Sequence, residues 1–116
     1  MKGKVLTIAG SDSSGGAGIQ ADIKTISALG GYAMSTITAI TVQDTNMVSD
    51  VYPIPAYIVK AQILSVLNDI GVDVIKTGML MSPDIILAVS EVLSDHIKPI
   101  PLVVDPVMMS TSGHML

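Results

Sequence analysis

Short apolar runs alternate along the chain with longer stretches in which apolar residues recur every three or four positions. The apolar runs predict strands at 5–9, 34–42, 72–76 and 101–104, with a short edge strand at 51–52. The periodic stretches predict helices at 17–29, between Pro55 and Gly71, and from Pro83 to about His96. This order predicts an α/β fold: a mainly parallel sheet with helices on both faces and right-handed crossovers.

Polar residues gather where the predicted strands end. The first strand leads into a loop at 10–18 that is rich in glycine and hydroxyl groups, and Gln43 follows the second strand. Met79 comes shortly after the third strand, and Asp105 directly follows the fourth, which we expect to be buried. The carboxyl ends of parallel strands share one edge of a sheet, where α/β proteins bind ligands. We expect the loop to form half of a site for a small polar or anionic ligand, with unpaired N–H groups at the start of its helix.

Two common phosphate-binding motifs fit this loop poorly. Residues 16–21 match the dinucleotide pattern G-x-G-x-x-A, but the preceding loop is long, and the acid expected about twenty residues later is represented only by Asp44, which comes too late. A P-loop would need lysine at the position that Gly16 occupies. Four glycines and three serines at one strand end still exceed what a connecting turn needs.

Composition narrows the classes of partner. The net charge is -4, and the sequence pI is about 4.7, which disfavours nucleic acid and anionic membrane surfaces. The chain has no cysteine, its apolar runs are too short to span a membrane, and the first of them, Val5 to Ala9, is too short for the apolar core of a signal peptide. We therefore expect a cytoplasmic protein with a small-molecule ligand.

For several candidate residues, the side-chain chemistry allows both a structural role and a ligand-binding role. Asp12 and Asp22 are either ordinary acids near a helix start or ligand contacts. Gln43 is either a turn residue or a planar amide suited to the edge of a heterocycle. Asp105 is either a turn residue before proline or a carboxylate for a metal ion or a phosphate-bearing cofactor.

Taken together, four segments resemble the hydroxymethylpyrimidine/phosphomethylpyrimidine kinases of thiamine synthesis, in the ribokinase-like superfamily. They are residues 6–12, 14–25, 76–80 and 105–108. The resemblance implies ATP- and Mg²⁺-dependent phosphorylation of hydroxymethylpyrimidine and then of its monophosphate. It also implies a pyrimidine pocket at Gly10, Ala17, Asp22, Gln43, Met79 and Val107. Asp105 would lie on the nucleotide and magnesium side.

The resemblance also implies that much of the enzyme lies elsewhere. Members of the family are about twice as long, and their later half supplies most of the ATP site and a catalytic Gly-rich loop with no counterpart here. We expect residues 1–116 to be the N-terminal portion of a single ribokinase-like kinase domain, truncated, without its catalytic residue and inactive alone. Its expected partner is a second copy or the missing C-terminal half. A pyridoxine or pyridoxal kinase and a non-catalytic pyrimidine-binding module remain the alternatives.

Overall fold

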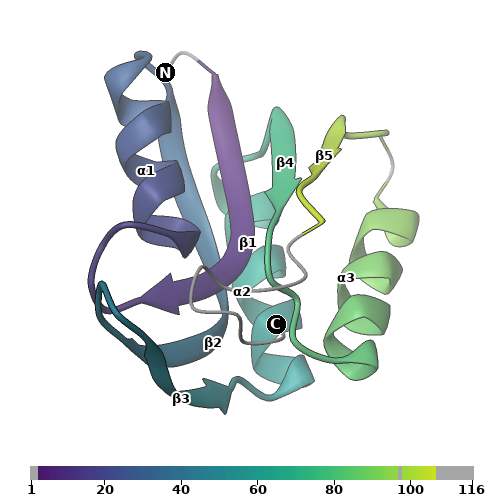
Figure 1. The fold of residues 1–116 in the computed structure, drawn as a ribbon. Helices are drawn as coiled ribbons and strands as arrows, with labels where there is room; N and C mark the ends of the chain where they lie inside the picture. Colours follow the sequence, from purple (N-terminus) through teal and green to yellow (C-terminus); the bar gives the residue numbers. More distant parts are fainter. Residues whose placement is uncertain (1–2, 97, 107–116) are drawn as a thin grey trace.

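The computed structural model describes residues 3–96 and 98–106, and it contains every element that the hydrophobic pattern predicts (Figure 1). The strands are β1 Lys4–Asp12, β2 Tyr32–Gln43, β3 Val48–Pro53, β4 Val74–Thr77 and β5 Leu102–Val104. The helices are α1 Gly18–Ala28, α2 Ala56–Asp69 and α3 Pro83–Asp95. Strand β1 extends three residues beyond the predicted end at Ala9 and carries Asp12 into the sheet edge.

The five strands form one sheet in the order β3-β2-β1-β4-β5. Strands β2, β1, β4 and β5 are parallel, and β3 pairs antiparallel with β2 at the outer edge. The expected mainly parallel sheet is confirmed. Because four strands run the same way, the polar segments after β1, β2, β4 and β5 meet at one edge.

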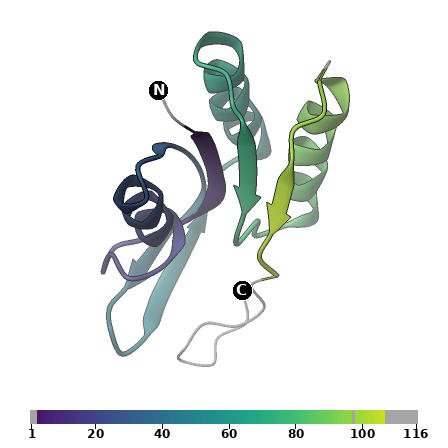
Figure 2. The ribbon, with the colours of Figure 1, turned by 90° about the horizontal axis from the view of Figure 1, so that it is seen from above.

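Alternation along β1 separates the two faces of the sheet. Leu6 and Ile8 are fully buried in a core with residues of α2 and α3, such as Ile63 and Val89. Thr7 points to the opposite face, where its hydroxyl donates a hydrogen bond to Asp22 of α1. Figure 2 shows α1 on one side of the sheet and α2 and α3 on the other. The expectation of helices on both faces is therefore confirmed.

Local sequence signals fix where α3 begins. The Ser82 hydroxyl accepts a hydrogen bond from the Ile85 N–H at 3.3 Å, and proline stands at the first helical turn, as the sequence predicts. None of the helices in the described ranges is long and apolar enough to cross a membrane.

Strand β5 differs from its predicted environment. We expected a buried strand, but Leu102, Val103 and Val104 are 46%, 56% and 61% exposed. They lie at the sheet edge beyond β4, and within residues 3–96 and 98–106 nothing pairs with their outer side. Asp105 accordingly follows an exposed apolar strand rather than a buried one.

Candidate functional site

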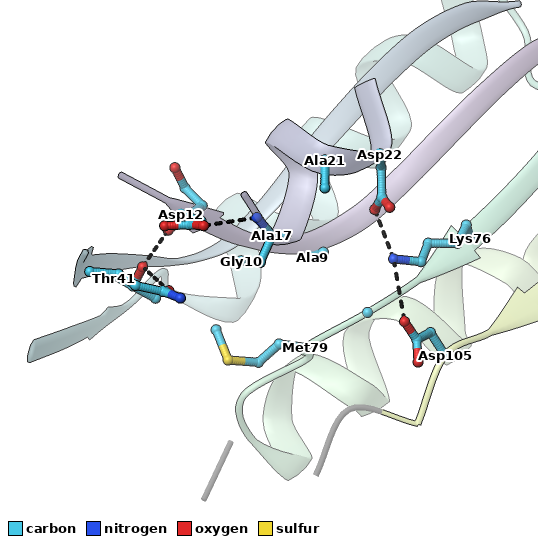
Figure 3. A pocket seen from close by; sticks show the side chains of 14 residues that line it. Ala9, Gly10, Asp12, Ala17, Ala21, Asp22, Thr41, Lys76, Met79 and Asp105 are labelled. Carbon is cyan, nitrogen blue, oxygen red and sulfur yellow. Dashed lines mark hydrogen bonds and ion pairs between the residues drawn. The ribbon is translucent and has the colours of Figure 1, made fainter. Parts of the chain in front are cut away.

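A cavity of about 260 Å³ opens at the carboxyl ends of β1, β2 and β4, beside the start of α1 (Figure 3). Its volume lies just below the range of about 300 to 1,000 Å³ that is usual for small-molecule pockets, so it suits a single-ring ligand. Six of the seven residues that the family resemblance assigns to the site line the cavity: Gly10, Ala17, Asp22, Gln43, Met79 and Asp105. The seventh, Val107, lies outside the described residues. The remaining lining residues are Ala9, Ser11, Asp12, Gly18, Ala21, Thr41, Lys76 and Gly78.

Asp12 organises the glycine-rich loop from inside. Its side chain is buried, with the residue only 4% exposed. One carboxylate oxygen accepts from the N–H and the hydroxyl of Ser14 at 2.8 and 2.7 Å. The other accepts from the N–H groups of Gly16 and Ala17 at 3.0 and 2.8 Å. The loop therefore folds around the Asp12 carboxylate.

This arrangement narrows the expectation that the N–H groups at the helix start are unpaired and ready for an anionic ligand, because Ala17 provides no side-chain cap for α1 but the N–H groups just before Gly18 are taken. Those of Gly16 and Ala17 already donate to Asp12, so Ala17 lines the cavity without a spare N–H. Burial raises the pKa of the Asp12 carboxyl, but the hydrogen bonds from Ser14, Gly16 and Ala17 together lower it by more. The net pKa therefore lies below the ordinary value of 3.8. Asp12 is thus ionised at neutral pH and serves the loop.

Two glycines allow the backbone to close tightly here. Gly18 has φ +58°, and a Cβ at this position would collide with the Gly10 carbonyl oxygen. A Cβ on Gly10 would collide with the terminal methyl of Met79. The missing side chain at position 10 lets Met79 lie across the end of β1 and form an apolar wall.

Gln43 is anchored by its backbone, which leaves its side chain at the cavity. The Ser13 hydroxyl donates to the Gln43 carbonyl at 2.6 Å and accepts from its N–H at 2.8 Å. The Thr41 hydroxyl donates its one proton to the Ser11 carbonyl oxygen at 2.7 Å and lies 3.2 Å from the side-chain oxygen of Gln43. Within residues 3–96 and 98–106, the amide nitrogen has no hydrogen-bond partner, so it is available to a ligand.

A chain of charges forms the opposite wall. The Oδ2 atom of Asp22 accepts from Thr7 Oγ1 at 2.6 Å and from Lys76 Nζ at 2.8 Å. Lys76 Nζ also lies 3.9 Å from a carboxylate oxygen of Asp105. Figure 3 shows Asp22, Lys76 and Asp105 in a row, with Asp12 and Thr41 across the cavity.

Lys76 and Thr7 were not predicted from the sequence as site residues. Each had a signal: Thr7 is polar in an apolar run, and Lys76 is charged at the end of one. Alternation places Lys76 on the face opposite the buried Ile75, the face that α1 covers.

The described residues contain no group of three or more histidine, cysteine or acidic side chains arranged for a metal ion. Asp105 offers one carboxylate, with its side chain 56% exposed. Mg²⁺ in kinases is commonly held by one or two carboxylates together with substrate phosphates and water. Asp105 therefore fits as a single protein ligand to a magnesium ion bound with a nucleotide.

The mainly parallel sheet with helices on both faces matches solved small-molecule kinases of the ribokinase-like class, and it carries a small cavity at the carboxyl ends of its strands. The sequence profile of the family described as phosphomethylpyrimidine kinase matches residues 12–116. The chain belongs to the phosphomethylpyrimidine kinase family.

Individual relatives agree with this assignment. The chain is 50% identical over 112 residues to the hydroxymethylpyrimidine/phosphomethylpyrimidine kinase of Streptomyces coelicolor, covering 97% of this chain and 41% of that protein. A crystal structure of phosphomethylpyrimidine kinase from Clostridium difficile matches with a TM-score of 0.90 and 56% identity, over 99% of this chain and 49% of the other. A pyridoxal kinase from Staphylococcus aureus, solved with AMP-PCP and pyridoxal, matches with a TM-score of 0.81 and 47% identity, over 92% and 39%. The chain thus spans less than half the length of each of these proteins.

Proposed function

We propose that this chain supplies the pyrimidine site of an ATP-dependent kinase that phosphorylates hydroxymethylpyrimidine and then its monophosphate for thiamine diphosphate synthesis. The observation that carries the proposal is the single cavity lined by Gly10, Ala17, Asp22, Gln43 and Met79. The C. difficile neighbour of the same fold is itself named a phosphomethylpyrimidine kinase.

In this proposal different residues of the cavity contact the edge and the faces of the pyrimidine ring. The Gln43 amide pairs with the aminopyrimidine edge, because its oxygen and nitrogen lie in one plane and offer an acceptor and donors. Met79 packs against one face of the ring, across Gly10. Ala17 contributes its methyl group, since its N–H is committed to Asp12. Val107 is proposed as a second apolar wall.

ATP and Mg²⁺ are the proposed cofactors. The magnesium ion would be held by Asp105 and would neutralise phosphate charge during transfer. Residues 1–116 are proposed as the N-terminal portion of the kinase domain, with the catalytic residue outside them and no turnover by the chain alone. The exposed β5 edge is the surface where the remaining sheet or a second copy would pair.

Calorimetric titration of the 116-residue chain with hydroxymethylpyrimidine tests the site. Gln43→Met should weaken binding about tenfold or more, because the ring edge then faces a thioether. The matched control is Gln62→Met, whose amide bonds the Ile37 backbone at 3.0 Å and does not line the cavity. That control should lower the thermal unfolding temperature but leave the dissociation constant unchanged. Equal binding by the wild type and Gln43→Met would reject the proposed ring contact.

The similarity to the S. aureus pyridoxal kinase favours a vitamin B6 kinase as the second candidate. Pyridoxal presents a phenolic oxygen and a ring nitrogen instead of an aminopyrimidine edge, so Gln43 discriminates between the two ligands. Gln43→Met should weaken the pyrimidine far more than pyridoxal. Equal losses for both ligands would remove this reason for preferring the pyrimidine.

A coupled assay with ATP separates the truncated kinase from a complete enzyme. We expect no pyrimidine-dependent ATP consumption by a sample whose intact mass is 12.0 kDa. Turnover by that sample would contradict the proposed inactivity. Binding without turnover, even after supply of the remaining part of a related kinase, would instead support a non-catalytic pyrimidine-binding module.

A further inference from the structure

Asp22 borders the cavity with one carboxylate oxygen occupied and the other open. Thr7 and Lys76 both donate to Oδ2, at 2.6 and 2.8 Å. In the part of the chain that the structure describes, no donor reaches Oδ1. Two donors on one oxygen fix the plane of the carboxylate, and the second oxygen remains as an acceptor for a ligand.

Among the described residues, Lys76 also has unused hydrogen-bonding capacity. Its ammonium group carries three donors. One goes to Asp22, whereas Asp105 at 3.9 Å is within ion-pair range but too distant for a hydrogen bond. Lys76 is the one cationic side chain among the described residues that line the cavity. A Cβ at Gly78 would lie 3.3 Å from Lys76 Nζ and 3.0 Å from the Ala9 side chain, so glycine keeps room for the ammonium group.

An open acceptor beside open donors complements a hydroxyl group, which both donates and accepts. We propose that Asp22 Oδ1 accepts a hydrogen bond from the ligand's hydroxymethyl group while Lys76 donates to the oxygen of that group. This inference rests on the proposed function, in which Gln43 takes the ring edge. Thr41, whose hydroxyl lies beside the Gln43 side chain, and Lys76 stand on opposite sides of the cavity in Figure 3.

The same pair would treat the second substrate differently. Phosphorylation replaces the hydroxyl hydrogen, so the arm can no longer donate to Asp22 and becomes anionic. Lys76 then becomes the main contact, and its charge offsets the repulsion between the phosphate and the two carboxylates beside it. Lys76 should therefore matter more for the monophosphate than for the free hydroxymethyl compound.

Calorimetry with three ligands tests this assignment. The ligands are 4-amino-5-hydroxymethyl-2-methylpyrimidine, its monophosphate and the analogue with a 5-methyl group. The wild type should prefer the hydroxymethyl compound to the methyl analogue by about tenfold, and Lys76→Met should reduce that preference to about twofold. The same variant should weaken the monophosphate by about 30-fold or more. Lys60→Met removes an equivalent charge from an exposed ion pair with Glu91, away from the cavity, and should change none of these values.

The outcomes separate this inference from the function beneath it. If the wild type binds none of the pyrimidines, the proposed function fails. If it binds them and Lys76→Met weakens the hydroxymethyl and methyl compounds equally, only the assignment to Lys76 is wrong. Should Lys76→Met fail to fold by circular dichroism, the Lys76 ¹³Cε resonance of the wild type gives the answer. It should shift more with the hydroxymethyl compound than with the methyl analogue, and equal shifts would overturn the inference.

Discussion

Asp12 and Asp22 border the same cavity, but their carboxylates have different hydrogen-bond partners. Asp12 is 4% exposed, and both of its oxygens are filled by hydrogen bonds from the loop that follows it. Asp22 also lines the cavity, but in the described part of the chain both of its donors bind one oxygen and none reaches the other. Lining a cavity therefore does not make a residue a ligand contact. We propose that unused hydrogen-bonding capacity distinguishes Asp22, as the carboxylate that meets the ligand, from Asp12, which holds the loop.

The sharpest contrast is expected in stability. Asp12→Ala removes the buried acceptor shared by the N–H groups of Ser14, Gly16 and Ala17, which should lower the free energy of unfolding by about 2 kcal/mol, because these residues are exposed and water can replace part of the lost bonding. Asp22→Ala should cost about 1 kcal/mol, because Lys76 is near water and only Thr7 loses a buried partner. Urea unfolding followed by circular dichroism measures both values. Equal losses would show that the two carboxylates do not differ as described.

Acid should remove the stabilisation that the ionised Asp12 side chain gives to the fold. Its pKa in the folded chain lies below the ordinary 3.8, so the ionised form stabilises the fold fully above pH 3.8. That stabilisation is lost as the pH falls through the lowered pKa. Asp12→Asn should therefore be less stable than the wild type by about 1 to 2 kcal/mol at pH 7, and the gap should shrink below pH 3.8. A gap that stays constant from pH 7 to pH 2 would contradict the role of the Asp12 charge.

For substitution of Asp22, we expect a large loss of ligand affinity and only a small loss of stability. Asp22→Asn keeps a side chain of similar shape and an oxygen for Thr7, but it removes the negative charge opposite Lys76. Binding of hydroxymethylpyrimidine should weaken about tenfold, while stability changes by less than about 1 kcal/mol. Calorimetric titration beside urea unfolding checks both. A variant that loses stability and keeps its affinity would place Asp22 with Asp12, as a structural residue.

A smaller effect is expected where the apolar wall meets the loop. Gly10→Ala should push the end of Met79 toward the cavity, because the new Cβ occupies the place of that methyl group. The flexible Met79 side chain can move, so stability should fall by less than about 1 kcal/mol and pyrimidine affinity by about threefold. The double variant Gly10→Ala, Met79→Ala provides the control, since removing the displaced side chain should relieve the crowding. No change in affinity for Gly10→Ala would mean that Met79 does not form the wall of the site.

The fold was largely predictable, because periodicity records which side chains are buried. The 3.6-residue period of α2 and the apolar run of β1 reflect a core that the structure contains. The environment of β5 was not predictable, because an apolar strand at a sheet edge has the same sequence as a buried one. Only the pairing order shows which strand is last.

The position of the candidate site was predictable from the sequence, but its hydrogen bonds and ion pairs were not. Strand order brings Gly10, Gln43, Met79 and Asp105 to one edge, and the cavity unites them. The hydrogen bonds of Asp12 depend on how the loop backbone turns, which glycine and serine content alone does not determine. The pairing of Lys76 with Asp22 joins residues 54 positions apart, and it follows only once α1 is placed on the same face as Lys76.

The most direct test of the account is an amide and side-chain NMR titration of the 116-residue chain with hydroxymethylpyrimidine. If the cavity binds the ring as proposed, the Gly10 and Gly78 amides and the Gln43 side-chain NH₂ should shift together in a saturable manner. Resonances of the groove between α2 and α3, such as those of Leu64 and Asn68, should stay in place. Saturable shifts confined to that groove, or no shifts at millimolar ligand, would contradict the central claim that this cavity is a pyrimidine site.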